Sequence, residues 1–261
     1  GLATVGARWG NDGRESSQGD GIIERQAPVA NKPAPEKKKP LKVYGHHFNS
    51  DTRTVLTLLD ISGIDYEFEE VDIFEGKHQE ASYLEMNPLG TIPLLIDDGC
   101  QLMGSTSIFA NYLTLTKPKL QSYRPKEHAN KIDQYLSWFN TVLRPCIQRL
   151  TKVIVGPKAF GQQDFTGDEI ESAKNAFFGD ILNRVNGMLE NRQFLISKSE
   201  PTVVDIIYYN EISSGLALTK IKGFKRMFPR VDEWVSNMGE IGELEVHAEK
   251  MFETLEKYQL E

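Results

Sequence analysis

The amino-acid sequence predicts an α/β domain of the βαβ-ββα type followed by an all-helical domain. Three observations predict this fold class. Strand-like and helix-like segments alternate from Leu41 onward, the pair Asp98-Gly99 lies between two apolar runs as in a β-hairpin, and only helical patterns follow a short Pro-containing linker. The boundaries expected for a flexible extension, an α/β domain and a helical domain are residues 1–40, 41–118 and 119–261.

The N-terminal extension differs in composition from the rest of the chain. It is rich in Gly, Pro, Ser and charged residues and shows no helical or strand period. Such a segment buries little apolar area, so we expect it to bind a protein partner rather than to contribute to the fold. It has no hydrophobic signal core, and its Arg and Ser content is compatible with the remnant of a mitochondrial presequence.

Each element of the α/β domain has a signal in the sequence. The first helix repeats Val55, Leu58 and Leu59 at helical spacing and is expected to stop at Gly63. The elements expected in chain order are a strand at 41–45, a helix at 51–63, a strand at 66–73, a short helix around residue 83, a turn at 87–93, a hairpin around 98–99 and a helix at 105–115.

Every segment after the linker has helical periodicity. The longest is an amphipathic run at about 126–153. Thr202 and Asp205 have the spacing of a capping box, which predicts a role in starting a helix rather than in catalysis. The last three helices are expected at about 202–216, 229–238 and 246–258.

Whole-chain composition excludes several classes of function. The net charge of −7 disfavours nucleic acid as a partner, because phosphate binding needs a clustered basic face. No apolar stretch approaches the roughly 20 residues of a membrane span. Two cysteines, Cys100 and Cys146, are too few for a disulfide framework. His46 and His47 are adjacent in the sequence and would point to opposite faces of a strand, so no metal site is expected. We therefore expect a soluble protein of a reducing compartment, the cytoplasm or the mitochondrial matrix.

Four motifs together resemble the glutathione S-transferase family. They are NPLGTIP, SIFANYL, PTVVDI and FPRVDEW, at residues 87–93, 107–113, 201–206 and 228–234. Long stretches are similar to theta-class sequences, with some phi-like features in the first strand. The resemblance implies a thioredoxin-like domain before the helical domain, glutathione as the cosubstrate, a cis peptide bond at Ile92-Pro93 and assembly into a homo- or hetero-oligomer.

The residue that should activate the thiol of glutathione departs from the family pattern. A hydroxyl that donates a hydrogen bond to the sulfur favours the thiolate. In theta and phi enzymes the resemblance places this donor, a Ser, four residues before an Arg. Here Arg53 is preceded at that distance by Asn49, and Ser50 lies one position along. The amide of Asn49 can still donate, whereas Ser50 needs a rotated loop, so both stay candidates for the catalytic donor.

The candidate glutathione-binding residues lie in three segments. His78 falls where the resemblance implies a contact with the glycyl carboxylate, the alternative being a solvated loop histidine. Ile92, before Pro93, would pair through its backbone with the cysteinyl unit. The family's Glu/Asp-Ser pair, which binds the γ-glutamyl end, is here Gly104-Ser105. Ser105 keeps the anion-binding half, but the counter-charge for the ammonium group is absent.

These departures lead to two hypotheses. The first is a glutathione S-transferase-like protein with a degenerate glutathione site, weakly active or inactive, which serves as a structural or docking subunit of a larger assembly. The alternative is an active theta-like transferase or peroxidase that conjugates glutathione to electrophilic small molecules. A thioredoxin-like redox enzyme is disfavoured because no cysteine lies at the candidate site.

Overall fold

The four strands of the α/β domain form one mixed sheet in the order β2-β1-β3-β4. β1 pairs in parallel with β2 and antiparallel with β3, which continues antiparallel to β4. The hairpin predicted at Asp98-Gly99 is confirmed, since both residues have positive φ and join β3 to β4. The strand bounds are Leu41–Gly45 for β1, Tyr66–Glu70 for β2, Leu94–Asp97 for β3 and Cys100–Leu102 for β4.

Residues 40–260 are described by the computed structural model and belong to one folded unit. The N-terminal extension and its expected partner-binding role lie outside the described residues. No helix within residues 40–260 is both long enough and apolar enough to cross a membrane.

Three helices belong to the α/β domain. The first of them begins after Asn49, whose side chain caps it, and ends at Gly63 in the left-handed conformation, so the predicted helix stop is confirmed. A 3₁₀ turn at Lys77–Gln79 precedes the second. The bounds are Ser50–Ser62 for α1, Ala81–Met86 for α2 and Thr106–Thr116 for α3.

The second part of the described chain is all helical, as predicted. The long amphipathic run is helical throughout, with a π segment at Phe139–Leu143 between its two α-helices, and a second π segment occurs at Ala176–Leu182. The helices are α4 (Ala129–Trp138), α5 (Arg144–Ile154), α6 (Gly156–Phe160), α7 (Gly167–Asn175), α8 (Asn183–Met188), α9 (Val203–Thr219), α10 (Phe224–Met227), α11 (Pro229–Gly239) and α12 (Gly242–Lys257).

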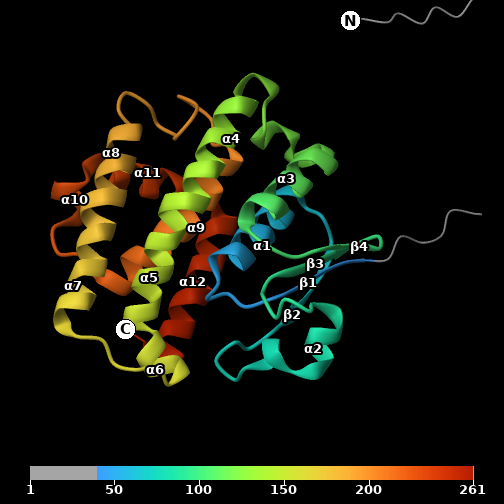
Figure 1. Cartoon of the computed structure of the whole chain (residues 1–261). Helices are drawn as coiled ribbons and strands as arrows, with labels where there is room; N and C mark the ends of the chain where they lie inside the picture. Colours follow the sequence, from blue (N-terminus) through green and yellow to red (C-terminus); the bar gives the residue numbers. More distant parts are fainter. Residues whose placement is uncertain (1–39, 261) are drawn as a thin grey trace, which may run out of the picture. The chain divides into compact units, whose positions relative to one another are not determined.

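Helix α9 is the centre of the packing. Its first ten positions are buried all around, because it contacts α1 of the α/β domain as well as α5 and α12 (Figure 1). The predicted capping box of Thr202 and Asp205 is present at its start. Asp205 also accepts hydrogen bonds from the backbone N–H of Leu195 at 2.8 Å and from Nε1 of Trp234 at 3.1 Å. The capping residues therefore anchor α9 to its neighbours and have the folding role expected of them.

Candidate functional site

A cavity of about 410 Å³ lies where the start of α1 meets α5, α9 and α12. Apolar side chains from both domains form much of its wall, among them Phe48, Ile147 and Leu255. Asn49 and Ser50 line this cavity as well. The other sequence-predicted site residues, which are His78, Ile92, Pro93, Gly104 and Ser105, do not line it.

Asn49 is the N-cap of α1. Its side-chain oxygen Oδ1 accepts a hydrogen bond from the backbone N–H of Thr52 at 2.8 Å and from the Thr52 hydroxyl at 3.1 Å. Asparagine is among the best N-cap residues, because this bond satisfies a backbone donor that the helix itself leaves unpaired. The amide of Asn49 is therefore held at the edge of the cavity by the helix that follows it.

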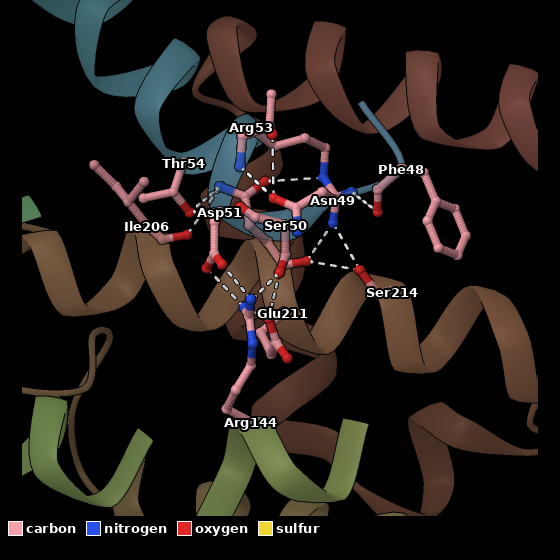
Figure 2. A network of polar contacts seen from close by, with 12 residues as sticks. Phe48, Asn49, Ser50, Asp51, Arg53, Thr54, Arg144, Ile206, Glu211 and Ser214 are labelled. Atoms are coloured by element: carbon pink, nitrogen blue, oxygen red, sulfur yellow. Dashed lines mark hydrogen bonds and ion pairs between the residues drawn. The ribbon is translucent and has the colours of Figure 1, made fainter. Parts of the chain in front are cut away.

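Ser50 belongs to a buried polar cluster that we define as Ser50, Asp51, Arg144 and Glu211. Figure 2 shows Ser50 and Asp51 at the start of α1, with Arg144 reaching toward them from α5 and Glu211 from α9. The Ser50 hydroxyl donates to the Glu211 carboxylate and accepts a hydrogen bond from Arg144 at 3.0 Å. The hydroxyl proton of Ser50 is thus already engaged in a hydrogen bond to the Glu211 carboxylate.

The charges of the buried cluster are paired through Arg144. Its guanidinium donates to both carboxylate oxygens of Asp51, one at 2.7 Å, and to Glu211 at 2.9 Å. Burial raises the pKa of Asp51 to about 6, although Arg144 opposes this shift. Burial lowers the pKa of Arg144, but the Glu211 and Asp51 carboxylates outweigh it and raise that pKa above its ordinary value. The guanidinium stays charged and holds the two carboxylates.

Arg53 connects the loop before α1 to α9. It is fully buried and donates to the carbonyl oxygens of His47 and Phe48 at 2.7 and 3.0 Å. It also donates to the carbonyl of Asn210 at 2.5 Å and to the Ser214 hydroxyl at 2.7 Å. Burial lowers the pKa of Arg53 to about 10. The Arg that marked the position in the sequence therefore shapes the loop that presents Asn49.

His78 lies in the 3₁₀ turn at Lys77–Gln79. Its Nδ1 atom is buried without a hydrogen-bond partner among the described residues, and burial lowers the pKa of the ring. The neighbouring Gln79 donates through its side chain to the carbonyl of Gly90 at 3.1 Å. This bond ties the turn of His78 to the turn that leads into Ile92.

The turn before β3 has the predicted cis bond at Ile92-Pro93. Asn87 stabilises it by donating to the carbonyl of Thr91 at 2.6 Å, to which the Tyr83 hydroxyl also donates at 2.7 Å. Whether this turn binds glutathione stays a prediction.

The start of α3 has no carboxylate at the position of Gly104. Gly104 has a φ of +128°, and Ser105 is the N-cap of α3 without a side-chain hydrogen bond to the helix. Asp97, the last residue of β3, is paired with Lys117 and accepts a hydrogen bond from the Tyr112 hydroxyl at 2.8 Å. Its carboxylate is therefore already engaged in an ion pair and a hydrogen bond.

Sequence reasoning did not predict that Asp51, Arg144 and Glu211 belong to the site. Glu211 lies near the end of a mostly apolar helical segment, VVDIIYYNEI. Its Asp205 is explained by the capping box, so the second charged residue, Glu211, was the available signal. Arg144 gave no comparable signal, because charged and polar residues such as Gln148, Arg149 and Lys152 recur along α5. Only the packing of three helices brings these side chains together.

A thioredoxin-like domain joined to a helical domain, with a cavity where the two meet, defines the class of protein. Residues 39–114 match the family model described as glutathione S-transferase, N-terminal domain. Residues 39–114 thus match a glutathione S-transferase N-terminal domain, and the described chain has the glutathione S-transferase fold.

Relatives and solved structures agree with this assignment. Glutathione S-transferase F9 of Arabidopsis thaliana is 27% identical over 173 residues, which cover 64% of this chain and 74% of the relative. Glutathione S-transferase T1 of the same plant is 26% identical over 212 residues, covering 76% and 82%. A human theta-class enzyme, solved with the glutathione conjugate of 1-menaphthyl sulfate, has a TM-score of 0.76 at 20% identity and covers 85% of this chain and 91% of its own. The relatives include both F and T types, so the theta-like class stays a prediction.

Proposed function

We propose that this protein is a glutathione S-transferase-like protein with a degenerate glutathione site, which binds glutathione weakly and conjugates it slowly. One observation carries the proposal, namely that Gly104 leaves no carboxylate for the ammonium group of glutathione while Asp97 is engaged elsewhere. Loss of such a charge-assisted hydrogen bond typically costs about 1.5 to 3 kcal/mol, or roughly ten- to a hundred-fold in affinity.

The biological role we propose is that of a structural or docking subunit in a larger assembly. This role rests on the composition of residues 1–40, which favours binding to a partner over folding alone. A reducing compartment, the cytoplasm or the mitochondrial matrix, is part of the same proposal.

The second candidate function is an active transferase on an electrophilic small molecule. The observation that favours it is the cavity of about 410 Å³ beside Asn49 and Ser50, which has an extensive apolar wall. A small apolar electrophile fits such a cavity and would lie next to the candidate thiol donors.

Calorimetric titration separates the two functions. We expect glutathione to bind with a Kd of about a millimolar, and conjugation of a chromogenic electrophile to be slow. A matched control is the glutathione analogue that lacks the α-ammonium group. Because Gly104 offers no acid for this group, the analogue should bind about as well as glutathione itself. Micromolar binding of glutathione, a large loss with the analogue and efficient conjugation would favour the active transferase.

A further inference from the structure

We infer that Asn49, through its amide nitrogen Nδ2, is the group that contacts a bound thiolate, and that Ser50 instead holds α1 against α5 and α9. This inference deepens the proposed function and rests on it, because it names the donor that any residual thiol chemistry uses. Asn49 and Ser50 differ in which of their hydrogen-bonding atoms are already engaged.

The orientation of the Asn49 amide follows from its bond to the backbone. A backbone N–H can only donate, so the Asn49 atom that lies 2.8 Å from the nitrogen of Thr52 is the oxygen. The other end of the amide, Nδ2, carries two N–H groups and donates no hydrogen bond to any residue within 40–260. Since Asn49 lines the cavity, these donors are available to a ligand there.

The Ser50 hydroxyl has the opposite status. Its single proton is donated to Glu211, and its oxygen accepts from Arg144 at 3.0 Å. Turning the hydroxyl toward a thiolate would remove a donor from Glu211, whose residue is only 2% exposed. A buried carboxylate that loses a donor is destabilised, so the rotation that Ser50 needs is opposed by the buried cluster.

The end of α1 at Asn49 suits a thiolate. The positive end of α1, a helix of 13 residues, begins directly after Asn49 and favours an anion. Arg144 and Glu211 both line the cavity, and the pairing of Arg144 with Asp51 and Glu211 offsets part of the negative charge of the two carboxylates without making the cluster positive. When a bound thiol ionises, its proton passes to water, and Nδ2–H stabilises the sulfur anion that remains.

Two substitutions remove the donor but keep the helix capped. Asn49→Asp keeps the side-chain oxygen that accepts a hydrogen bond from Thr52. Asn49→Gly removes it, but glycine at an N-cap generally lowers stability by only about a few tenths of a kcal/mol. With glutathione at saturation, the ultraviolet absorbance of the thiolate is measured against pH. We expect either variant to lower the thiolate fraction at pH 7 by roughly ten-fold, as loss of a donor to a charged group implies. Thr166→Gly, at the N-cap of α7, is the control for loss of a cap elsewhere.

Ser50→Ala gives the contrasting measurement. It should reduce the thiolate fraction less than Asn49→Gly does, while lowering the melting temperature more, because it takes a donor from Glu211. The inference is overturned if Ser50→Ala abolishes the bound thiolate and the Asn49 variants do not. It is equally overturned if glutathione bound to the unaltered protein has the same thiolate fraction at pH 7 as free glutathione.

The same data distinguish this inference from the proposed function. Tight glutathione binding with rapid conjugation would refute the degenerate site, yet a ten-fold loss in the Asn49 variants would still support Asn49 as the donor. Weak binding with an unchanged thiolate fraction in those variants would support the degenerate site and refute the role of Asn49.

Discussion

At Gly104 the backbone adopts a conformation that L-residues rarely take. Its φ is +128°, which glycine reaches without steric cost. An added Cβ would lie 2.9 Å from Cδ1 of Ile108, the far end of a side chain that is 46% exposed and able to move. The main obstacle to a side chain here is therefore the backbone conformation and not the available space.

If the proposed function holds, Gly104→Glu should supply a counter-charge for the ammonium group of glutathione at a cost in stability. We expect glutathione to bind about ten-fold more tightly or better, as a charge-assisted hydrogen bond implies. The same variant should unfold more easily by about 1 to 3 kcal/mol because of the strained φ. Gly104→Ala is the matched control, with a similar loss of stability and no gain in affinity. Equal affinities of the two variants, measured by calorimetry, would remove the counter-charge argument.

His47 packs between Phe68 and His247, with ring centroids 5.1 and 5.5 Å away. Burial, together with the nearby His247 and Arg53, lowers the pKa of His47 to about 4. The unfolded chain, with an ordinary pKa of 6.5, thus binds more protons than the folded chain between these values. His47 therefore lowers the free energy of unfolding as the pH falls from 6.5 toward 4. Above pH 6.5 it causes no such loss, because the ring is neutral in both states.

Asp51 acts in the opposite direction over nearly the same range, because its pKa is raised to about 6 in the folded protein. His47→Phe keeps an aromatic ring in the same packing but removes the titration. We expect this variant to lose less stability than the unaltered protein between pH 7 and pH 5, as measured by urea unfolding at both values. An identical loss in the two proteins would show that His47 is not protonated on unfolding.

Residue spacing in the sequence was sufficient to find Asn49, Ser50 and the Arg that follows them. It could not choose between the first two, since the choice depends on Glu211, which is 161 residues away from Ser50. Hydrogen bonds between distant helices leave no periodic signal. The local half of the site could therefore be predicted, whereas the contacts from the helical domain could not.

At the scale of elements, α1 is held to the helical domain by polar contacts as well as by its apolar face. Arg53 donates to α9 through Asn210 and Ser214, and Arg144 of α5 pairs with Asp51 at the start of α1. Arg53 is fully buried, and so are the carboxylates that pair with Arg144, so an unpaired charge here would cost far more than at the surface. The position of α1, and with it that of Asn49, depends on these pairs.

Arg144→Ala should lower the free energy of unfolding by about 3 to 5 kcal/mol, because it leaves two buried carboxylates unpaired. Arg230→Ala is the control, since Arg230 pairs with Glu190 at 3.3 Å on the surface and such pairs contribute about 1 kcal/mol or less. Denaturant unfolding of both variants tests this. Similar losses in the two variants would show that the buried cluster contributes no more than a surface ion pair.

Sequence patterns predicted most helices and strands, but the elements that pair with or pack against them determine where they end. The second strand was expected to continue to residue 73 but ends at Glu70, because its neighbour β1 ends at Gly45 and offers no further partner in the ladder. The π segment at Phe139–Leu143 was not predicted, since the apolar pattern continues through it. Pairing and packing across the chain set these details.

On the scale of the whole molecule, the outer side of α3 has unpartnered apolar residues. Ile108 and Leu115 are 46% and 64% exposed, and their spacing of seven residues places them on one face of the helix. The sequence resemblance implied assembly into a homo- or hetero-oligomer. Large exposed apolar side chains that share one face are typical of an interaction surface.

We therefore predict that the protein is a dimer in solution and that the double substitution Ile108→Glu and Leu115→Glu makes it a monomer. Two carboxylates on each copy would have to be buried opposite apolar surface, which outweighs the apolar gain of association. Light scattering after size exclusion measures the mass, and circular dichroism checks that the fold is retained. Met227→Glu, at a residue that is 45% exposed on α10, is the matched control and should remain dimeric. A dimer that survives the double substitution must use another face, and an unaltered protein that is monomeric leaves α3 free for a different partner.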